Sequence, residues 1–324
     1  MKLVKKLAVG VSLVFATALA SATGYPSKPI RLIVPLAPGG GGDMAARLVA
    51  GEMAKTLGQS IIIENKPGAS SVIGTSLAAK SEGDGYTLLF VTDFHAINEA
   101  MNRLGKLQSK LPYDSIKDFG AVGHVLNLPI ALLASKNSGI KSMRELTDKA
   151  RSMNGGMSAG MLGEGSPHYL AFLNMQRLGN YKLIEVPYGG SGPATIAVQA
   201  GEVDLAFSTV GAAMQMAQAD RARLLAVSGP TRDPLAPDVP TIAESGYPGF
   251  SIVSWMGILA PKTVPAERLQ TLNAALNKAL ANPAVASKLK ANGMYPAPGS
   301  REEFAKLLVD ETSKMEQIYR NSKK

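Results

Sequence analysis

The sequence predicts an α/β fold with mainly parallel β-sheets, arranged as two lobes with a ligand cleft between them. Apolar runs of strand length alternate with segments whose apolar residues have helical spacing, which is the pattern of α/β chains. Loops rich in glycine and serine join several of these strands to the helices that follow. About 300 residues remain beyond the N-terminal segment, and this length favours two domains over one.

In the first third of the chain, IRLIVPL at 30–36 and SIIIEN at 60–65 are short β-branched runs that end at proline or polar residues, which predicts two strands. Residues 43–58 between them have helical spacing, with Asp43 placed as N-cap and Gly58 placed to end the helix. A second helix is expected from about Val72, and YTLLFVT predicts a third strand at 86–92.

The same alternation continues to the C-terminus. Apolar runs bounded by polar or glycine-rich segments predict the later strands, and longer stretches with helical spacing predict the helices between and after them. The strands are expected at 130–135, 182–188, 203–209 and 223–229, and the helices at 142–152, 167–178, 191–200, 265–281 and 302–321.

Proline-containing segments near 123–129 and 228–240 are the candidate crossovers between the lobes. We therefore predict one domain built from residues 23–125 and 228–324, and a second domain built from residues 126–227. In such a fold the ligand cleft is lined by the loops that follow the carboxyl ends of the strands.

The first 22 residues have the features of a secretory signal peptide. Three lysines precede the apolar run LAVGVSLVFATALASA, which is shorter than the roughly 20 residues of a membrane span and ends in small residues that fit an A-x-A cleavage site. The chain has no cysteine, which excludes disulfides, thiolate metal sites and lipid attachment through an N-terminal cysteine. We therefore expect residues 1–22 to be cleaved and the mature protein to be periplasmic.

The charge balance is basic but evenly spread along the chain. The formal net charge of +9 falls to about +6 when the three lysines of the predicted signal peptide are removed. Scattered Lys and Arg residues favour long-range attraction of small anions, and no basic motif interleaved with aromatic residues points to nucleic acid. We expect a monomer that binds a small anion and has no nucleic-acid partner.

The glycine-rich stretch APGGGGD at 37–43 is the first candidate site. It follows a predicted strand and opens a predicted helix, so its backbone N–H groups form an anion site. The helix dipole contributes roughly 0.3–1 kcal/mol for a nearby negative charge. With Asp43 capping its own helix, the donors at 38–42 stay free for the carboxylate of a small molecule. The candidate ligand-binding residues here are Ala37, Pro38, Gly39, Gly40 and Asp43.

Four further strand–loop–helix junctions carry glycine, hydroxyl or other polar residues that suit a small carboxylate. They follow the predicted strands or precede predicted helices, so in an α/β sheet they are expected to gather at one edge. The candidates are Ala69, Ser70 and Ser71; Thr92, Asp93, Phe94 and His95; Gly160, Met161, Gly163, Ser166 and His168; and Tyr188, Gly189 and Ser191.

An NAD-type oxidoreductase is the alternative interpretation of the first loop. The first predicted strand leads into the pattern G-x-G-x-x-A at 40–45, and Glu64 ends the next strand where a ribose-binding acid would lie. Against this, Pro35 and Pro38 interrupt the tight strand-to-glycine turn, and Asp43 would repel a pyrophosphate. Export also removes the protein from cytoplasmic nicotinamide pools.

Other enzyme signatures are missing from the sequence. No Lys-Ser or Lys-Thr follows the glycines, and the segment around Ser191 reads GGSGP rather than G-x-S-x-G. His95, His124 and His168 do not share a helix at metal-binding spacing. We therefore expect no enzymatic activity, no cofactor and no metal.

Taken together, the motifs resemble the Bug family, the TctC-like periplasmic receptors of tripartite tricarboxylate transporters. The resemblance covers essentially the whole mature chain and rests on the order of the motifs. They read YPSKPIRLIVPLAPGGGGD, IIIENKPGA, GDGYTLL, LPYDSIKDF, GSPHYLA, VPYGGSGPA, GEVDLAF, APDVPTIAESGYPGF and WMGILAP.

This resemblance implies a two-lobed, type II-like periplasmic-binding-protein fold that closes on a small carboxylate and delivers it to the transporter's membrane subunits. By analogy, the first glycine loop and the loop at 68–71 would grip one carboxylate, partly through bridging waters. Residues from 158–168 and 188–191 would complete the site, and Asp204 would cap or orient neighbouring loops. A carboxylate receptor that feeds a sensor kinase is a further alternative.

Three departures from the family pattern bear on the ligand. Phe94 follows Asp93 where relatives usually carry small or polar residues. The segment at 158–168 is longer and contains Met161 and Leu162, and MNRLGKLQSKLPYD has several residues more than the usual approach to PYD. The ligand class is therefore expected to be an aromatic or dicarboxylic acid, and the extra apolar side chains favour a flat or aromatic carboxylate over citrate.

Overall fold

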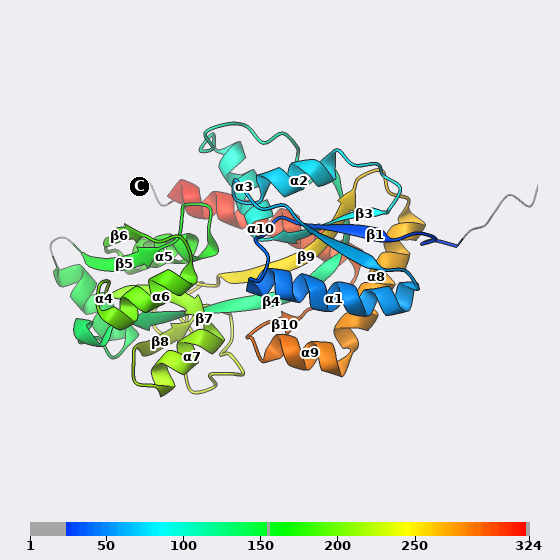
Figure 1. The fold of residues 1–324 in the computed structure, drawn as a ribbon. Helices are drawn as coiled ribbons and strands as arrows, with labels where there is room; N and C mark the ends of the chain where they lie inside the picture. Colours follow the sequence, from blue (N-terminus) through cyan, green and yellow to red (C-terminus); the bar gives the residue numbers. More distant parts are fainter. Residues whose placement is uncertain (1–23, 154–155, 322–324) are drawn as a thin grey trace, which may run out of the picture.

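Two α/β lobes are joined by two long antiparallel strands, β4 (Phe119–Ala134) and β9 (Val253–Pro261), which run between them (Figure 1). The structure is a computed structural model that describes residues 24–153 and 156–321. The predicted signal peptide at 1–22 lies outside the described residues. Residues 119–129 of β4 pair with β9 in the first lobe, and residues 130–134 pair with two strands of the second lobe.

The first lobe is built around a sheet whose three leading strands are parallel. β1 pairs with β2 on one side and β3 on the other, and β9 continues the sheet antiparallel to β3. The strands are β1 (Ile30–Val34), β2 (Ile61–Asn65), β3 (Thr87–Thr92) and the short β10 (Tyr295–Pro296) on β4. The helices are α1 (Gly41–Leu57), α2 (Val72–Ala79), α3 (Phe94–Arg103), α8 (Ala266–Ala281) and α9 (Pro283–Lys290).

The second lobe repeats this arrangement. β5 pairs in parallel with β6 and β7, and β7 and β8 each pair antiparallel with β4. The strands are β5 (Met157–Met161), β6 (Leu183–Pro187), β7 (Leu205–Thr209) and β8 (Arg223–Val227). The helices are the 3₁₀ turn η1 (Lys136–Ser138), α4 (Met143–Ser152), α5 (Pro167–Gly179), α6 (Ser191–Ala200) and α7 (Val210–Gln218).

The last helix, α10 (Arg301–Asn321), extends across both lobes (Figure 1). Near its N-terminus, Phe304 is buried in the first lobe together with Trp255 of β9. Near its C-terminus, Met315 and Tyr319 belong to a core cluster that also holds side chains of α3 and of the second lobe's β5 and α5. The helix therefore reinforces the connection that β4 and β9 make.

The predicted α/β class is confirmed, and several predicted elements need correction. The strand expected at 130–135 is the end of β4, which begins at Phe119 and includes the expected crossover segment at 123–129. Residues 157–161, expected to be a loop, form strand β5. Helices α3, α7 and α9 and strand β9 were not predicted. Among the described residues, no helix is long and apolar enough to cross a membrane.

Contacts near residue 250 bear on where the chain returns from the second lobe to the first. Ile252 N–H donates to Ser228 O (3.1 Å), and Ser228 Oγ donates to Ile252 O (2.6 Å). Tyr247 and Phe250 belong to the core cluster of the second lobe. The predicted boundaries after residues 125 and 227 stay predictions, and we propose that the second crossing occurs at Val253 instead.

Replacing Phe304 tests the packing between α10 and β9. The ring is 1% exposed, lies 5.8 Å from the Trp255 ring, and covers Gly257, where an added Cβ would come within 2.0 Å of the Phe304 ring. We expect Phe304→Ala to lower the free energy of unfolding by about 3–5 kcal/mol, because it leaves a buried cavity. The measurement is urea unfolding followed by circular dichroism.

The matched control is Val309→Ala on the same helix, where the side chain is 46% exposed. Its free energy of unfolding should change by less than about 0.5 kcal/mol. Equal losses for the two variants would contradict the packing described for α10.

Candidate functional site

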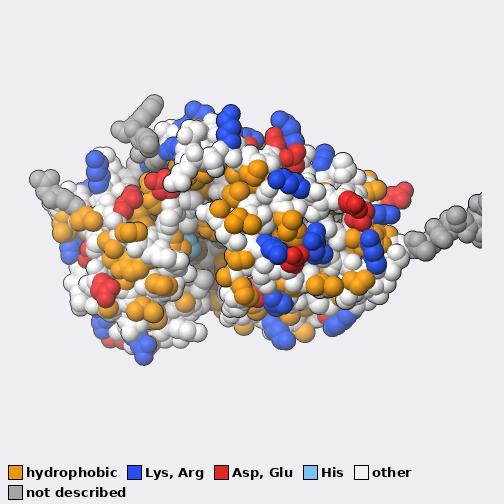
Figure 2. Space-filling model, turned by 45° about the horizontal axis from the view of Figure 1, so that its top comes forward, with side chains coloured by type: hydrophobic (Ala, Val, Ile, Leu, Met, Phe, Trp, Pro, Cys, Tyr) orange, Lys and Arg blue, Asp and Glu red, His pale blue; other side chains and the backbone are white. Residues whose placement is uncertain are grey.

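The loops that follow the carboxyl ends of the parallel strands face each other from the two lobes. In the first lobe they lead into α1, α2 and α3, and in the second lobe into α5, α6 and α7. A Cβ added to Gly165, before α5, would lie 3.9 Å from both Ser70 Oγ and Asn98 Oδ1 of the first lobe. The surface is notched between the lobes (Figure 2). Such strand ends are where α/β folds bind ligands.

The N-terminus of α1 offers free backbone donors. Gly40 is the N-cap and provides no side-chain hydrogen bond. Within the described chain, the N–H groups of Gly40, Gly41 and Gly42 donate no hydrogen bond. The helix therefore presents unsatisfied N–H groups and the positive end of its dipole, which together form an anion site.

Asp43 holds this loop in place, which corrects its expected role as N-cap. It is the third residue of α1 and is 3% exposed. Its carboxylate accepts hydrogen bonds from Arg47 Nε (2.9 Å), Gly39 N (3.0 Å) and Asn65 Nδ2 (2.8 Å). The Arg47 hydrogen bond, with those from Gly39 and Asn65, lowers the pKa of Asp43 to about 2 against the opposing effect of burial. The Gly39 N–H therefore donates to Asp43 and is not free to bind a ligand.

The second loop, at 68–71, has an unusual backbone. Ala69, Ser70 and Ser71 have positive φ values of 46°, 50° and 76°, which non-glycine residues rarely adopt. Ser71 Oγ donates to Pro35 O (3.3 Å), and Asn98 Nδ2 donates to Ser70 O (2.8 Å). The Ser71 hydroxyl thus points at the protein, whereas Ser70 and Ala69 are exposed. Strained backbone of this kind gathers at binding sites.

The junction between β3 and α3 is largely buried and is not brought to the surface of the cleft. Asp93 is 3% exposed and accepts a hydrogen bond from Ser254 Oγ, and burial raises its pKa to about 7. His95 Nε2 bonds Ser115 O (2.8 Å), and burial lowers the pKa of His95 to about 4. Thr92 is 6% exposed. Phe94 is half-buried at the start of α3.

In the second lobe, Gly160 and Met161 lie in β5 rather than in a loop. Met161 is 2% exposed and belongs to the core, so it is not the expected pocket wall. Its carbonyl accepts a hydrogen bond from Tyr188 N (2.8 Å), and a Cβ on Gly160 would lie 3.4 Å from the Tyr188 ring. Gly160 therefore allows the tyrosine to pack across the end of the strand. Leu162 is half-buried against the second-lobe core.

The segment after β5 leads into α5 as the sequence predicts. Gly163 is exposed, and Ser166 is the N-cap, whose Oγ accepts from Tyr169 N (3.1 Å). Both ring nitrogens of His168 are buried and have no hydrogen-bond partner in the described part of the chain. Burial lowers the pKa of His168 to about 4, so the ring is neutral at pH 7.

The N-terminus of α6 is a second uncapped helix start. Gly190 is the N-cap and provides no side-chain hydrogen bond, and Gly189 before it is exposed. Among the described residues, the N–H groups of Ser191 and Gly192 have no acceptor. This end of α6 therefore resembles the start of α1, but it belongs to the opposite lobe.

Asp204 lies at the other end of the same strands. Its carboxylate accepts from Ser158 N (2.9 Å) and Ser158 Oγ (2.8 Å), at the beginning of β5. Three residues of strand, about 10 Å, separate Ser158 from Met161 at the cleft end. Asp204 therefore aligns β5 with β7 and lies away from the cleft loops.

One junction of this set was missed from the sequence. Thr209 ends β7 and caps α7, with its Oγ1 accepting from Ala212 N (3.4 Å). A threonine before the apolar run VGAAMQMAQ is the usual signal of a helix start, so helix α7 could have been predicted from the sequence.

Comparison with known proteins assigns the family. A family model described as the tripartite tricarboxylate transporter family receptor, TctC, matches residues 45–323. The chain belongs to this family. It is 34% identical over 97% of its length to a UPF0065 protein from the tcbD–tcbE intergenic region of Pseudomonas sp. strain P51, covering 93% of that protein. It is also 30% identical to BugT of Bordetella pertussis, covering 93% of this chain and 91% of BugT.

Solved structures of similar proteins share the fold. The R. palustris protein Rpa4515, solved with adipate, superposes with a TM-score of 0.80 at 30% identity, over 92% of this chain and 98% of that one. MatC from Rhodopseudomonas palustris, solved with bound malate, gives a TM-score of 0.76 at 32% identity, over 91% and 99% of the two chains. These similarities confirm the predicted two-lobed periplasmic-binding-protein fold and the solute-receptor family.

Replacing Asp93 tests its buried, protonated state. An aspartate has a pKa near 3.9 in an unfolded chain, and about 7 here. The folded state therefore binds a proton that the unfolded state releases, and this contribution to stability is present below about pH 4 and lost as the pH rises through 7. Asp93→Asn has no such loss. We expect its stability relative to wild type to rise by about 3 kcal/mol between pH 4.5 and 8.

The measurement is urea unfolding of both proteins at the two pH values. Asp148→Asn is the control because its side chain is 69% exposed on α4, and the difference from wild type should change by less than about 0.5 kcal/mol. A difference for Asp93→Asn that does not vary with pH would show that Asp93 is ionised throughout.

Proposed function

We propose that the protein is a periplasmic receptor that binds a small carboxylate between its two lobes and delivers it to the membrane subunits of a tripartite tricarboxylate transporter. The observation that carries this proposal is the pair of uncapped helix N-termini, α1 in the first lobe and α6 in the second. Their free N–H groups can donate to carboxylate oxygens, and their dipoles favour negative charge.

Lobe closure supplies the mechanism for such a receptor. A carboxylate that accepts hydrogen bonds from both lobes binds the closed arrangement better than the open one, and so shifts the equilibrium towards closure. Closure around the ligand changes the surface that the membrane subunits meet. The receptor performs no chemistry on its ligand in this account, acts as a monomer, and needs no cofactor.

Relatives support the choice of ligand class. The two similar structures described above were solved with adipate and malate, which are both dicarboxylates. The N–H groups at 40–42 and the exposed Ser70 provide donors in the first lobe, and Gly189, Ser191 and His168 lie in the corresponding segments of the second. We propose these residues as ligand contacts, with Asp43 holding the first glycine loop and Asp204 aligning β5 with β7 at the far end of these strands.

Two contacts weigh against the dinucleotide alternative. Glu64, the residue expected to bind a ribose, forms ion pairs with Arg31 (3.3 Å) and Lys66 (3.0 Å). The Gly39 N–H, a donor that a pyrophosphate would use, is bonded to Asp43 (3.0 Å). Both groups have protein partners, which supports a small carboxylate rather than a dinucleotide.

Substitutions at Gly40 test the α1 site without straining the backbone. Its φ is −78°, and a Cβ there would meet nothing nearer than Ala37 O at 3.8 Å. We expect Gly40→Asp to reduce carboxylate affinity at least tenfold, because its charge competes for the free N–H groups and repels the ligand. Gly40→Ala keeps the donors and should bind within about threefold of wild type.

Affinity is measured by isothermal titration calorimetry, with circular dichroism to confirm that both variants fold. If Gly40→Asp bound its ligand as tightly as Gly40→Ala, the start of α1 would have no part in binding.

A thermal-shift screen of the mature protein identifies the ligand and separates the two interpretations. The panel contains mono-, di- and tricarboxylates, aromatic acids, NAD and NADP. At a hundredfold excess over the dissociation constant, a ligand that binds the native state alone stabilises it by roughly 2.7 kcal/mol. We expect stabilisation by a carboxylate. Stabilisation by a nicotinamide cofactor and by no carboxylate would contradict the proposal.

A further inference from the structure

A hollow of about 530 Å³ lies beside the loop at 68–71, on the first lobe. One side is formed by Ser70, Val72 and Asn98. The other side is formed by residues 107–112, in the segment that follows α3. The hollow therefore lies between the loop that opens α2 and the segment that follows α3.

The charge in this hollow is not compensated. Lys110 is its charged lining residue, and no acidic residue of the described chain lines it. Lys110 also forms no ion pair within the described residues, whereas nearby Arg103 pairs with Glu99 (3.0 Å) and Lys106 lies over the Tyr319 ring. An exposed ammonium group with no acid beside it favours an anion.

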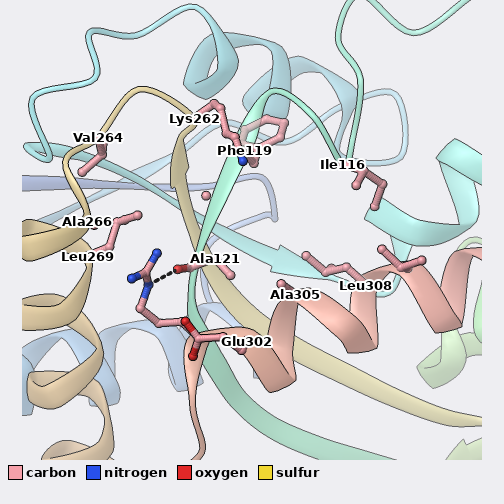
Figure 3. Close-up of a pocket in the computed structure, with 13 residues that line it drawn as sticks. Ile116, Phe119, Ala121, Lys262, Val264, Ala266, Leu269, Glu302, Ala305 and Leu308 are labelled. Carbon is pink, nitrogen blue, oxygen red and sulfur yellow. Dashed lines mark hydrogen bonds between the residues drawn. The ribbon is translucent and has the colours of Figure 1, made fainter.

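Two other hollows differ in having an acidic lining residue. A hollow of about 420 Å³ between α8 and α10 has the acidic Glu302 and the basic Lys262 among its lining residues (Figure 3), together with Arg301. The hollow where β4 and β9 cross between the lobes contains Glu311 beside Lys314. The hollow beside Ser70 thus differs from these two in having a basic lining residue and, among the described residues, no acidic one.

The hollow adjoins the proposed carboxylate site. Ser70 lines it and also belongs to the loop that faces the second lobe, where an added Gly165 Cβ would lie 3.9 Å from Ser70 Oγ. Asn98 lines it as well and holds Ser70 by a hydrogen bond to its carbonyl (2.8 Å). A molecule anchored in the cleft can therefore extend past Ser70 into the hollow.

The walls between Ser70 and Lys110 suit an apolar chain. Val72, Leu107 and Leu111 line the hollow, and all three are half-buried, so their apolar surface is partly open to an occupant. A carboxylate alone would leave these side chains uncovered, whereas methylene groups between two carboxylates would pack against them.

We propose that Lys110 binds the distal carboxylate of an α,ω-dicarboxylate whose other carboxylate occupies the cleft, with the methylene chain lying along this hollow. The inference rests on the proposed function, because it needs the first carboxylate to bind between the lobes. It assigns Lys110 as a specificity-determining residue for elongated dicarboxylates.

The test compares dicarboxylates of four to ten carbons with the monocarboxylates of the same length, by isothermal titration calorimetry on the mature protein. Wild type should bind the best-fitting dicarboxylate about tenfold or more tightly than its monocarboxylate partner, the effect of one charge-assisted hydrogen bond. Lys110→Gln should remove most of this ratio and leave monocarboxylate affinity unchanged. Lys110→Arg should retain it.

Lys80→Gln is the matched control, since Lys80 is an exposed lysine at the far end of α2 and does not line the hollow. It should preserve the ratio of affinities. The proposal is overturned if Lys110→Gln keeps the wild-type ratio, or if it weakens both ligand classes equally.

The same titrations separate this inference from the proposed function. If wild type binds carboxylates but Lys110→Gln keeps the wild-type ratio of dicarboxylate to monocarboxylate affinity, the distal subsite alone is overturned. Absence of binding by any carboxylate to wild type overturns both.

Discussion

The carboxylate of Asp43 is the group on which the geometry of the proposed site depends. It is buried, yet it stays ionised because it accepts hydrogen bonds from Arg47, Gly39 and Asn65. These bonds connect the glycine loop to the body of α1 and to the end of β2. Four glycines alone would leave the loop flexible, because they lack side chains that could fix it. Because Asp43 fixes the loop through these hydrogen bonds, the backbone that carries the free N–H groups at 40–42 has a defined conformation.

Binding between the lobes also requires that the two lobes stay connected. β4 runs from its pairing with β9 in the first lobe to its pairing with β7 and β8 in the second, and α10 packs on both lobes. In the proposed site the uncapped start of α1 comes from the first lobe and that of α6 from the second, so neither half is complete without the other. A ligand that accepts hydrogen bonds from both helix starts favours the closed arrangement of the two lobes over the open one.

The alternation of strands and helices and most junction loops could be predicted from the sequence, since they depend on local apolar spacing and on glycine and proline. Strand β5 could not, because MSAGM has small residues that read as a loop. Gly160 is small because the Tyr188 ring packs over it, a contact between segments far apart in the chain. The central part of β4 was missed for a similar reason, since its apolar run is interrupted by glycine, histidine and asparagine.

Some roles of the site residues could not be predicted either, because they depend on contacts between distant segments. His95 lies directly after a strand end, as ligand-binding residues do, yet Tyr113 and Phe119 enclose it and Ser115 satisfies one of its nitrogens. Asp43 was expected to cap α1 because it is the first polar side chain there, but the four residues before it are glycines and the helix begins at the third of them, Gly41. Burial and helix starts of this kind depend on tertiary packing, which a single sequence does not display.

The most direct test is a crystal structure of the mature protein with the carboxylate that stabilises it most. The account predicts one carboxylate group within about 2.7–3.2 Å of backbone nitrogens at 40–42 in the first lobe, with the same ligand bonded to the start of α6 in the second. A carboxylate bound elsewhere, with the nitrogens at 40–42 facing only solvent, would contradict it.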